Sequence, residues 1–486
     1  MIEAKHAELE NWNATEAVDV VEDKGKKLIF TRWVITEKEF APGQFKPKAS
    51  LVVRGFEESN EEQVDAPTAS KAALRIVLAI AADKQWSLEH VDIKSAFLQG
   101  RKLDRNVYLK PPEEAATGNK IWRLRKAAYG LVDAARNWYL SVKEVLTHLG
   151  CVQSNLDKAV FRWYEKDELL GAVVLHVDDF MFAGTKLYHN KVTEEVVMKF
   201  KVGLRKANVF KYVGLNIRKE DDKIVLQQDE YVNELQLFDT DMLKEDTALS
   251  TDEMRLLREV GGQLLWISSQ TRPDLSFDTL EMSVSRNNAS TKTLKRCLKV
   301  IKKAKERSSY LVFTSTGGDL MLQVYADAGF CNLPDKMSST AGFVILLVGE
   351  KGSCLLDWGS SKIKRKVSST LEAEVLALKE ALNNAIYLGS LLTEFKYNDF
   401  VKNQIPIVAF TDNKPTEQNI RSTKQVKEKR LRIDIGEIQR MLTESEVNDV
   451  KWVPSEEQIA DVMTKRDVVS KVKLLERITD GFHTQW

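Results

Sequence analysis

The sequence predicts two mixed α/β regions separated by a helical segment, and three observations support this division. Up to about residue 240, short apolar runs with strand spacing alternate with helical ones, which is an α+β pattern. From 241 to 316 the apolar residues recur mostly at helical spacing, with TRPDLS as an interruption. From 317 to 486, three strand-like runs are followed by alternating helices and strands.

Each element is predicted from its hydrophobic period. In the first region, period-two runs indicate strands at 28–40, 48–56, 88–98 and 172–184, and helical spacing indicates helices at 70–86 and 133–150. In the last region, the same criteria give strands at 320–330, 340–349, 354–360, 405–413 and 449–454, a long helix at 369–395 and a last helix at 456–465.

Composition favours a soluble globular protein of several domains. The chain has 486 residues and a net charge of +1, and it has neither a signal-peptide pattern nor an apolar run long enough for a membrane helix. We therefore expect no membrane association and a cytoplasmic or nuclear location. Basic clusters at 291–307, 361–366 and 424–432 suggest a track for a phosphate backbone, although one such cluster is usually a solvated helix face.

Two adjacent acids, Asp178 and Asp179, lie between two apolar runs where a hairpin is expected. A solvated turn is one explanation, but the turn lacks the glycine that tight hairpins favour. Asp92 ends another apolar strand, where a helix cap is the alternative. Carboxylates from separate strands suit a two-metal phosphoryl-transfer site, because divalent cations about 3.5 to 4 Å apart neutralise their repulsion. We expect Asp178 to be the closer metal ligand and Asp179 the more tolerant one.

Six motifs follow one another along the chain: VDIKSAFLQG (91–100), VYLKPP (107–112), WRLRKAAYGLVDAARNWY (122–139), LHVDDFMFAG (175–184), KYVGLNI (211–217) and TRPDLSF (271–277). In this order they resemble the motifs of the reverse transcriptase of copia-type (Pseudoviridae-like) LTR retrotransposon polyproteins. Any one of them is a weak signal, whereas six in the same order are a strong one.

The resemblance implies an α+β right-hand polymerase (fingers, palm and thumb) joined by a helical connector to an α/β RNase H fold. Fingers and palm would be 1–240, the helical thumb or connection 241–316, and the RNase H domain 317–486. It implies an RNA-directed and DNA-directed DNA polymerase that also degrades RNA in RNA/DNA hybrids. Each active site would use two Mg²⁺ ions, with Mn²⁺ as a substitute.

The resemblance also assigns roles around the polymerase site. Asp92, Asp178 and Asp179 would be metal ligands, and Phe97 would exclude a ribose 2′-hydroxyl. Tyr129 and Gly130 would line the incoming nucleotide and the template. The primer grip would be formed by Tyr212, Val213, Gly214 and Leu215.

Two departures from the family pattern concern the nucleotide. Ser50 stands where relatives commonly have Arg, which leaves Lys46, Lys48 and Arg54 as alternative contacts for the triphosphate. Ala135 replaces a common Pro, which removes no chemical group.

Four acids of the last region, Asp327, Glu374, Asp412 and Asp461, match the Asp-Glu-Asp-Asp set of RNase H enzymes and would bind its metals. Glu372 competes for the helical position, but the motif aligns on the second glutamate. Such a site reads hybrid shape and 2′-hydroxyls rather than base edges. Polar contacts to the hybrid would come from Ser338, Ser339 and Asn413.

The expected partners are an RNA template, a DNA primer, the RNA/DNA hybrid and dNTPs, with a second copy or the integrase of the same element as further partners. The expected location is a cytoplasmic virus-like particle, the nucleus, or both. A domesticated or decayed copy that retains only nuclease or binding activity is the alternative, and Ser50 is the one residue that points to it.

Overall fold

The protein is described here by a computed structural model, which divides into two compact units. The first consists of Met1–Ala69 and Glu89–Lys206, and the second of Ser70–Leu88 and Ala207–Trp486. The predicted boundary at 240 and 241 lies outside the described residues, so the three-domain division stays a prediction. The structure describes the chain except residues 42–43, 59–63, 240–245, 307–309, 398–402, 425, 467–471, 473–474 and 476–486.

The N-terminal part of the first unit combines a four-stranded sheet, ordered β1-β7-β6-β2, with the two-stranded ribbon β3-β4. Trp12 of α1 and Trp122 of β7 stack with their ring centroids 5.6 Å apart in the core of this part. The elements are α1 (Ile2–Ala14), β1 (Val18–Val21), β2 (Leu28–Ile29), β3 (Thr31–Ala41), β4 (Gln44–Val53), β6 (Tyr108–Leu109) and β7 (Ile121–Leu124), with 3₁₀ turns at Gly55–Glu57 and Glu113–Ala115.

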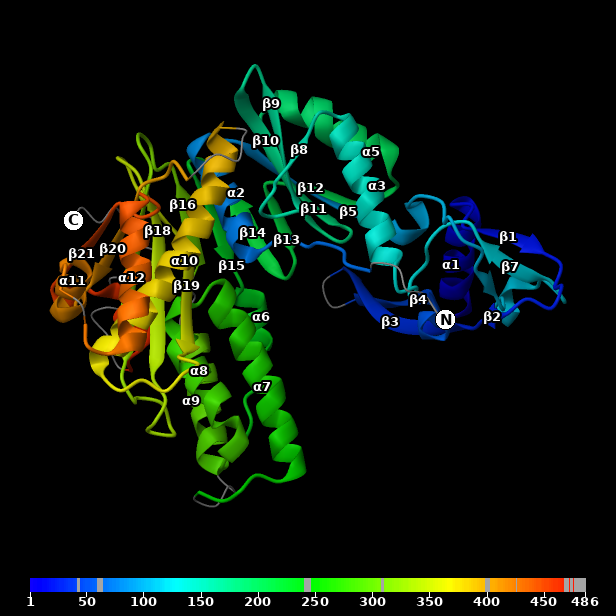
Figure 1. Cartoon of the computed structure of the whole chain (residues 1–486). Coiled ribbons are helices and arrows are strands. Elements are labelled where there is room, and N and C mark those ends of the chain that lie inside the picture. The colour runs from blue at the N-terminus through cyan, green and yellow to red at the C-terminus, as the bar shows by residue number, and fades with distance from the viewer. Residues whose placement is uncertain are drawn as a thin grey trace. The chain divides into compact units, whose positions relative to one another are not determined.

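The rest of the first unit is a six-stranded sheet in the order β12-β5-β11-β10-β9-β8. Helix α3 lies against this sheet (Figure 1). Its apolar side chains, including Trp138 and Val142, form one core with the sheet. The elements are β5 (Ser87–Ile93), α3 (Ala134–His148), β8 (Val152–Gln153), β9 (Val160–Glu165), β10 (Glu168–His176), β11 (Asp179–Gly184), α4 (Lys186–Tyr188), α5 (Glu194–Lys199) and β12 (Val202–Ala207), with a 3₁₀ turn at Ala96–Gln99 and a π-helical turn at His189–Thr193.

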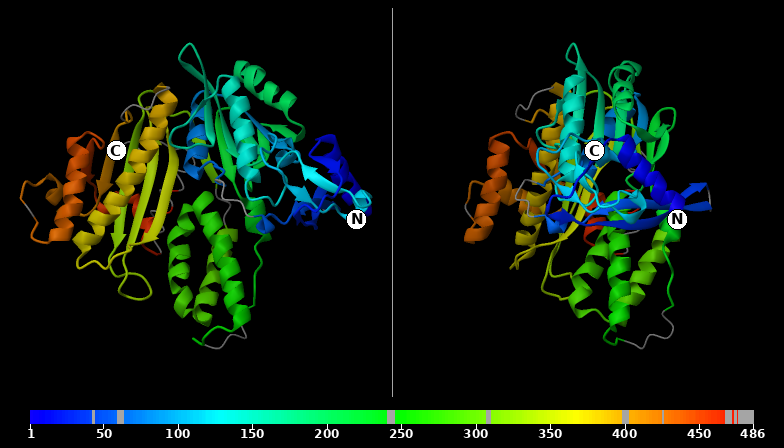
Figure 2. Two further views of the ribbon diagram at one scale, coloured as in Figure 1. Left: turned by 45° about the vertical axis from the view of Figure 1, so that its right-hand side comes forward. Right: turned by 90° about the vertical axis from the view of Figure 1, so that its right-hand side faces the viewer.

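The second unit begins with α2 (Lys71–Asp83) and contains the antiparallel sheet β13-β14-β15-β16. Helices α7, α8 and α9, green in Figure 2, form a small bundle. Helices and the predicted interruption at Pro273 are confirmed, but β16 near the end of the segment is a strand. The elements are β13 (Val209–Tyr212), β14 (Leu215–Lys219), β15 (Lys223–Gln227), α6 (Asp229–Glu234), α7 (Thr251–Gln270), α8 (Ser276–Val284), α9 (Thr291–Glu306) and β16 (Tyr310–Thr314), with 3₁₀ turns at Pro273–Leu275 and Ser285–Asn288.

A buried arginine explains why α2 clusters with the second unit. The guanidinium of Arg75 donates to the carbonyl oxygens of Leu356, Ser269 and Gln270 at 3.0, 2.8 and 3.0 Å. It also lies 3.9 Å from the ring centroid of Trp358. These bonds satisfy a charged group that would otherwise be costly to bury, and they hold α2 against the end of α7 and against β19.

The second sheet of this unit has the order β19-β18-β17-β20-β21. Strands β17, β18 and β19 are antiparallel, whereas β20 runs parallel to β17 and β21 parallel to β20. Helix α10 packs on β17 and β18, and α12 packs on α10. The elements are β17 (Met321–Gly329), β18 (Thr340–Val348), β19 (Ser353–Lys362), α10 (Thr370–Tyr397), β20 (Ile407–Thr411), α11 (Lys414–Arg421), α12 (Lys429–Thr443) and β21 (Asp449–Trp452).

The predicted last helix at 456–465 is wrong, because this segment forms two short 3₁₀ turns, Ser455–Glu457 and Ile459–Met463. Gln458 separates them. Its side chain accepts from the backbone N–H of Ala460 at 3.2 Å and donates to the carbonyl of Ala326 at 2.9 Å. The bond to β17 and the local bond to Ala460 replace a continuous helical hydrogen-bond ladder. Among the described residues, no helix is both long and apolar enough to cross a membrane.

Candidate functional sites

The first site lies at the tip of the β10–β11 hairpin. His176 pairs with Asp179, so Val177 and Asp178 form a two-residue turn. Val177 has a φ of +57°, which is costly for a β-branched residue and is typical of functional sites. Two hydrogen bonds hold the tip in place: Trp138 Nε1 donates to the Val177 carbonyl at 2.7 Å, and the Ile93 N–H donates to the Asp178 carbonyl at 3.0 Å.

The second of these bonds ties the tip to the end of β5, next to Asp92. The pKa of Asp178 is raised, first by burial and then by the charges of Asp179 and Asp92. Lys48 of β4 lowers the same pKa. Asp92, Asp179 and Lys48 therefore all lie near enough to Asp178 for their charges to act on its carboxylate.

Asp92 and Asp179 are each in contact with a neighbouring strand. A Cβ atom added to Gly203 of β12 would lie 2.7 Å from Asp92 Oδ2, so the backbone of β12 passes directly beside this carboxylate. Asp179 Oδ1 lies 2.9 Å from Nε2 of His90, which is 3% exposed. Sequence reasoning missed both neighbours. His90 had a signal in the sequence, because it lies two residues before Asp92 and alternate strand residues share a face.

Two aromatic residues predicted to meet the nucleotide lie against each other. The rings of Phe97 and Tyr129 have centroids 4.7 Å apart and planes tilted by 59°. Burial raises the pKa of Tyr129, and the charge of Asp178 raises it further. Gly130 has a φ of +94°, and a Cβ atom there would collide with the carbonyl oxygen of Val53. Only glycine fits at this close approach of two chain segments.

Of the cations proposed for the triphosphate, Lys46 and Lys48 lie on β4, whereas Arg54 lies outside this strand. On β4, Lys46, Lys48 and Ser50 alternate with buried Ala49 and Leu51, so the three polar residues share the other face. Lys48 is exposed and acts on Asp178.

Arg54 lies beyond the end of this strand. Its guanidinium is 3.7 Å from Glu57 Oε1 and 5.9 Å from the ring centroid of Phe30. The structure therefore brings Lys48, but not the bonded Arg54, toward the carboxylates.

The predicted primer-grip residues form the turn between β13 and β14 in the second unit. Tyr212 pairs with Leu215, and Val213 and Gly214 both have positive φ, of +47° and +74°. Positive φ at both central residues is the signature of a type I′ hairpin turn. Gly214 lies near Trp266 of α7.

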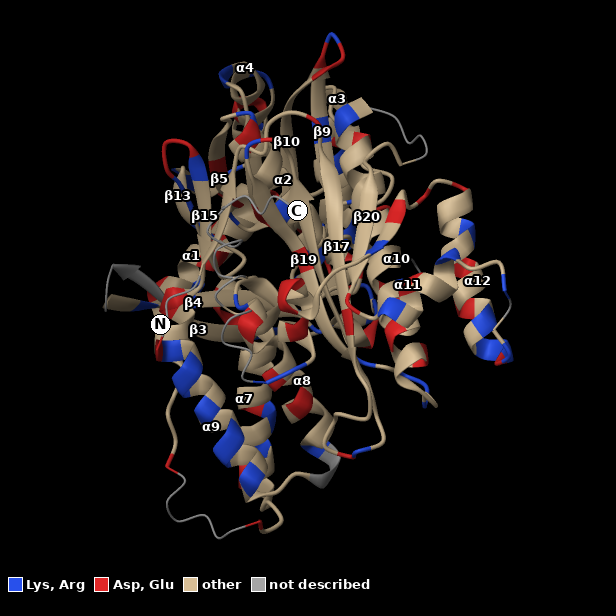
Figure 3. Ribbon diagram, turned by 90° about the vertical axis from the view of Figure 1, so that its left-hand side faces the viewer, with Lys and Arg blue, Asp and Glu red and all other residues tan. Residues whose placement is uncertain are grey.

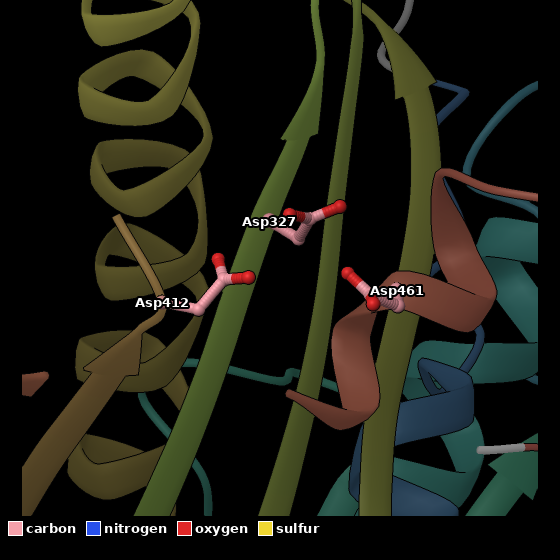
Figure 4. Close-up of side chains that lie close together, drawn as sticks. All are labelled: Asp327, Asp412 and Asp461. Carbon is pink, nitrogen blue, oxygen red and sulfur yellow. The ribbon is translucent and has the colours of Figure 1, made fainter. Parts of the chain in front are cut away.

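The second site is a cluster of three aspartates on the five-stranded sheet. One carboxylate oxygen each of Asp327, Asp412 and Asp461 lies within 4.8 Å of the other two (Figure 4). Asp327 lies on the central strand β17, Asp412 directly follows the parallel strand β20, and Asp461 comes from the turn Ile459–Met463. Asp327 and Asp461 are buried. Such a dense group of carboxylates suits a hard divalent cation.

Glu374 of α10 faces this cluster from the adjacent helix. Burial raises its pKa well above the usual value, and the charges of Asp327 and Asp412 raise it further. Its Oε2 is buried without a hydrogen-bond partner in the described part of the chain. Glu372, the competing residue, accepts from the Ser368 N–H at 2.7 Å and pairs with Arg365 at 3.0 Å.

Three further side chains contact the aspartates, and sequence reasoning had assigned none of them a role. The ammonium of Lys465 lies 2.5 Å from Asp461 Oδ1 and 3.5 Å from Asp327 Oδ1. The hydroxyl of Thr464 donates to Asp327. Ser455 donates to Asp412 Oδ2 at 2.7 Å. These donors supply part of the compensation that the buried carboxylates need.

Comparison with known proteins identifies the N-terminal half. The family "Reverse transcriptase (RNA-dependent DNA polymerase)" matches residues 15–249. Residues 15–249 belong to the reverse transcriptase family. The match contains the β10–β11 hairpin with Asp178 and Asp179, as well as Asp92 on β5.

Relatives of the chain are Pol polyproteins of copia-type retrotransposons, which confirms the resemblance predicted from the motifs. The Pol polyprotein from transposon RE1 of Arabidopsis thaliana is 26% identical over 90% of the chain and 31% of its own length. Those from transposon TNT 1-94 of Nicotiana tabacum and Ty1-DR6 of Saccharomyces cerevisiae are each 24% identical, over 100% and 98% of the chain and 38% and 28% of their own lengths. The chain spans about a third of the length of these relatives.

A solved structure is similar in fold to most of the chain. The structure of "the foamy viral protease-reverse transcriptase dRH in complex with ds DNA" matches with a TM-score of 0.56 and 10% identity. The match covers 93% of this chain and 69% of the other. At this identity the likeness concerns the fold alone.

Three polar residues predicted to touch a hybrid already make bonds within the protein. Ser338 donates to Asp335, and Ser339 Oγ accepts from the Cys331 N–H at 2.9 Å. Asn413 caps α11 by accepting from the Thr416 N–H at 2.9 Å. These bonds give each residue a structural role within the fold.

Proposed function

We propose that this chain is an RNA-directed and DNA-directed DNA polymerase with ribonuclease H activity, acting in retrotransposon replication. The observation that carries the proposal is the convergence of Asp92, Asp178 and Asp179 at the tip of the β10–β11 hairpin, within a domain of the reverse transcriptase family. In this proposal the first site is the polymerase site of a right-hand fold with fingers, palm and thumb.

The like charges of the three carboxylates favour bound divalent cations. Asp178 is half-buried beside two like charges, an arrangement that a bound cation would stabilise. Asp92, Asp178 and Asp179 would hold Mg²⁺, with Mn²⁺ as a substitute, and the bound ions would supply charge stabilisation for the in-line attack of the primer 3′-hydroxyl. The protein's own contribution is to fix these carboxylates through the strained turn at Val177 and the bond from Ile93.

Side chains around the tip would position the dNTP. The ammonium of Lys48 would pair with the triphosphate, in place of the arginine that Ser50 replaces. Phe97, braced by Tyr129, would exclude a ribose 2′-hydroxyl by its bulk. Gly130, whose lack of a side chain leaves room for the Val53 carbonyl, would line the incoming nucleotide and the template.

Two features of the second unit would contact nucleic acid. The turn Tyr212–Leu215 would support the primer strand. Helix α9 carries exposed Lys292, Lys299 and Lys302 on one face. Blue bands mark the Lys and Arg residues of α9 in Figure 3. A row of ammonium groups along a helix suits a phosphate backbone, whose negative charges are evenly spaced.

The second site would be the ribonuclease H site. The sheet order, with three antiparallel strands and two further strands parallel to β17, is the order expected of an RNase H fold. Asp327, Glu374, Asp412 and Asp461 would hold two Mg²⁺ ions, and the unpartnered Oε2 of Glu374 would coordinate one of them. The bound ions would supply activation of water and stabilisation of the leaving oxygen.

The proposed function also suggests which molecules the chain binds and where it acts. The chain would bind an RNA template, a DNA primer, their hybrid and dNTPs. Because the relatives are polyproteins about three times longer, association with a second copy or with the element's integrase is also proposed. Replication of this kind would take place in a cytoplasmic virus-like particle, in the nucleus, or in both.

Primer extension on an RNA template with Mg²⁺ tests the polymerase assignment. Wild type is expected to extend the primer, and Asp178→Asn to abolish extension because a metal ligand loses its charge. Asp167→Asn, the same change at an exposed residue at the other end of β10, is the matched control and is expected to behave as wild type. Extension by Asp178→Asn at the wild-type rate would refute the assignment.

A further inference from the structure

The strand that carries Asp92 also carries a buried histidine in contact with Asp179. His90 and Asp92 are two residues apart on β5 and therefore share a face. Val91 and Ile93 belong to the core beneath the sheet, so His90 and Asp92 face the opposite side. His90 is 3% exposed, and its Nε2 lies 2.9 Å from Asp179 Oδ1.

We propose that His90 is a positioning residue that fixes the Asp179 carboxylate for metal binding. The proposal rests on the proposed polymerase function of the first site. An ionised carboxylate only accepts hydrogen bonds, so Nε2 of His90 carries the proton and donates it. The bond engages Oδ1 of Asp179 and leaves Oδ2 for a cation.

Asp179 needs such a support for two reasons. Its side chain is 32% exposed, so it can rotate into water, and the like charge of Asp178 next to it favours that rotation. His90, by contrast, is fixed by burial within a central strand. Hydrogen-bond partners of metal ligands typically contribute 10- to 100-fold in metal affinity or activity.

Three substitutions separate this role from simple packing. His90→Gln keeps an N–H donor at about the position of Nε2. His90→Leu keeps an apolar side chain of similar reach but has no donor. His90→Asn keeps an amide but is too short to reach Asp179. His148→Leu, at an exposed histidine of α3 in the same unit, is the matched control.

Mn²⁺ binding measured by electron paramagnetic resonance is the direct test. The parent for this test is the full chain with Asp327→Asn and Asp461→Asn, which remove the second site. The Mn²⁺ binding that remains when Asp178→Asn is added to this parent is subtracted as background. We expect His90→Leu and His90→Asn to weaken Mn²⁺ binding about 10- to 100-fold, and His90→Gln and His148→Leu to bind as the parent does. Parent-like affinity in His90→Leu, or equal weakening in His90→Gln, would overturn the proposal.

Two further measurements exclude a loss of folding. In an Asp179→Asn background, His90→Leu is expected to weaken Mn²⁺ binding no further, because its effect passes through that carboxylate; an added loss would overturn the proposal. In primer extension, His90→Leu is expected to raise the Mg²⁺ concentration for half-maximal rate and to recover at high Mg²⁺, which a misfolded protein cannot do. If the parent extends no primer, the proposed function fails, while the Mn²⁺ comparison still decides the role of His90.

Discussion

The two carboxylate sites differ in how the protein compensates their charge. At the β10–β11 hairpin, Asp179 is 32% exposed and accepts a bond from His90, and Lys48 acts from another strand. On the five-stranded sheet, Asp327 and Asp461 are 1% and 3% exposed, and the ammonium of Lys465 contacts both. Water screens the charges of the half-exposed first site, whereas the buried second site relies on the ammonium of Lys465. The position of the carboxylates therefore matters most at the first site, and the amount of buried charge matters most at the second.

The largest effect is expected at Glu374. Glu374→Gln is predicted to reduce hybrid cleavage on the order of 10³-fold, because a charge that would hold the proposed metals is lost. The same substitution is expected to stabilise the fold at neutral pH, although it lowers the activity. The pKa of Glu374 is raised in the fold, so its stabilising contribution is present below its ordinary value of 4.5 and is lost as pH rises toward the raised value.

Thermal unfolding in EDTA from pH 4 to pH 8 measures this effect. The midpoint of Glu374→Gln is expected to exceed that of wild type at neutral pH, and the difference is expected to vanish at the acid end. Equal midpoints at neutral pH would show that the buried charge is already compensated. Glu380→Gln, on the same helix and bonded to Ser361, is the matched control.

A smaller effect is expected at Gly203, where placement rather than charge is at stake. A methyl group there would lie 2.7 Å from Asp92 Oδ2 and would displace this carboxylate, whose side chain can rotate cheaply. Gly203→Ala is therefore predicted to reduce primer extension about 10- to 100-fold with little change in the unfolding midpoint. Gly262→Ala, at a helical glycine with open space around it, serves as control. Unchanged extension would contradict the close approach of β12 to Asp92.

Substitution of Lys48 tests whether a residue of β4 supplies the positive charge that contacts the dNTP triphosphate. Lys48→Ala is predicted to reduce kcat/KM for dNTP about 10- to 100-fold, as expected for one charge-assisted hydrogen bond. Arg54→Ala is predicted to have a smaller effect, because Arg54 pairs with Glu57. Steady-state kinetics with a single dNTP measures both variants. The reverse order would transfer the role to Arg54.

The smallest effect concerns α9. Replacing Lys292, Lys299 and Lys302 by Gln is predicted to weaken duplex binding modestly and to reduce the slope of log K against log salt by about 0.9 for each phosphate that a lysine no longer neutralises. Binding isotherms over a range of NaCl concentrations measure the slope. An unchanged slope would exclude this face of α9 from nucleic-acid binding.

The sequence predicted what depends on local pattern. Asp178 and Asp179 were found because two apolar runs bracket them, and Asp92 because it ends an apolar strand. What it missed depends on residues far apart in the chain. Gly203 meets Asp92 only through strand pairing, and Gln458 breaks the predicted last helix by bonding to β17.

Arg75 is a further example of a long-range effect. It lies in a helix whose apolar pattern predicted its structure correctly, yet no local pattern reveals that it binds carbonyls almost 200 and 300 residues away. Buried polar groups find hydrogen-bond partners that are distant in the chain, and such partners explain much of what could not be predicted from the sequence.

One assay tests the central claim that the chain contains two independent phosphoryl-transfer sites. A 5′-labelled RNA template with a DNA primer of a second label reports DNA synthesis and RNA cleavage in the same reaction with Mg²⁺. Asp178→Asn is predicted to abolish synthesis and to keep cleavage of a preformed hybrid, and Asp327→Asn to do the reverse. Loss of both activities in either variant, or of neither in both, would contradict the account.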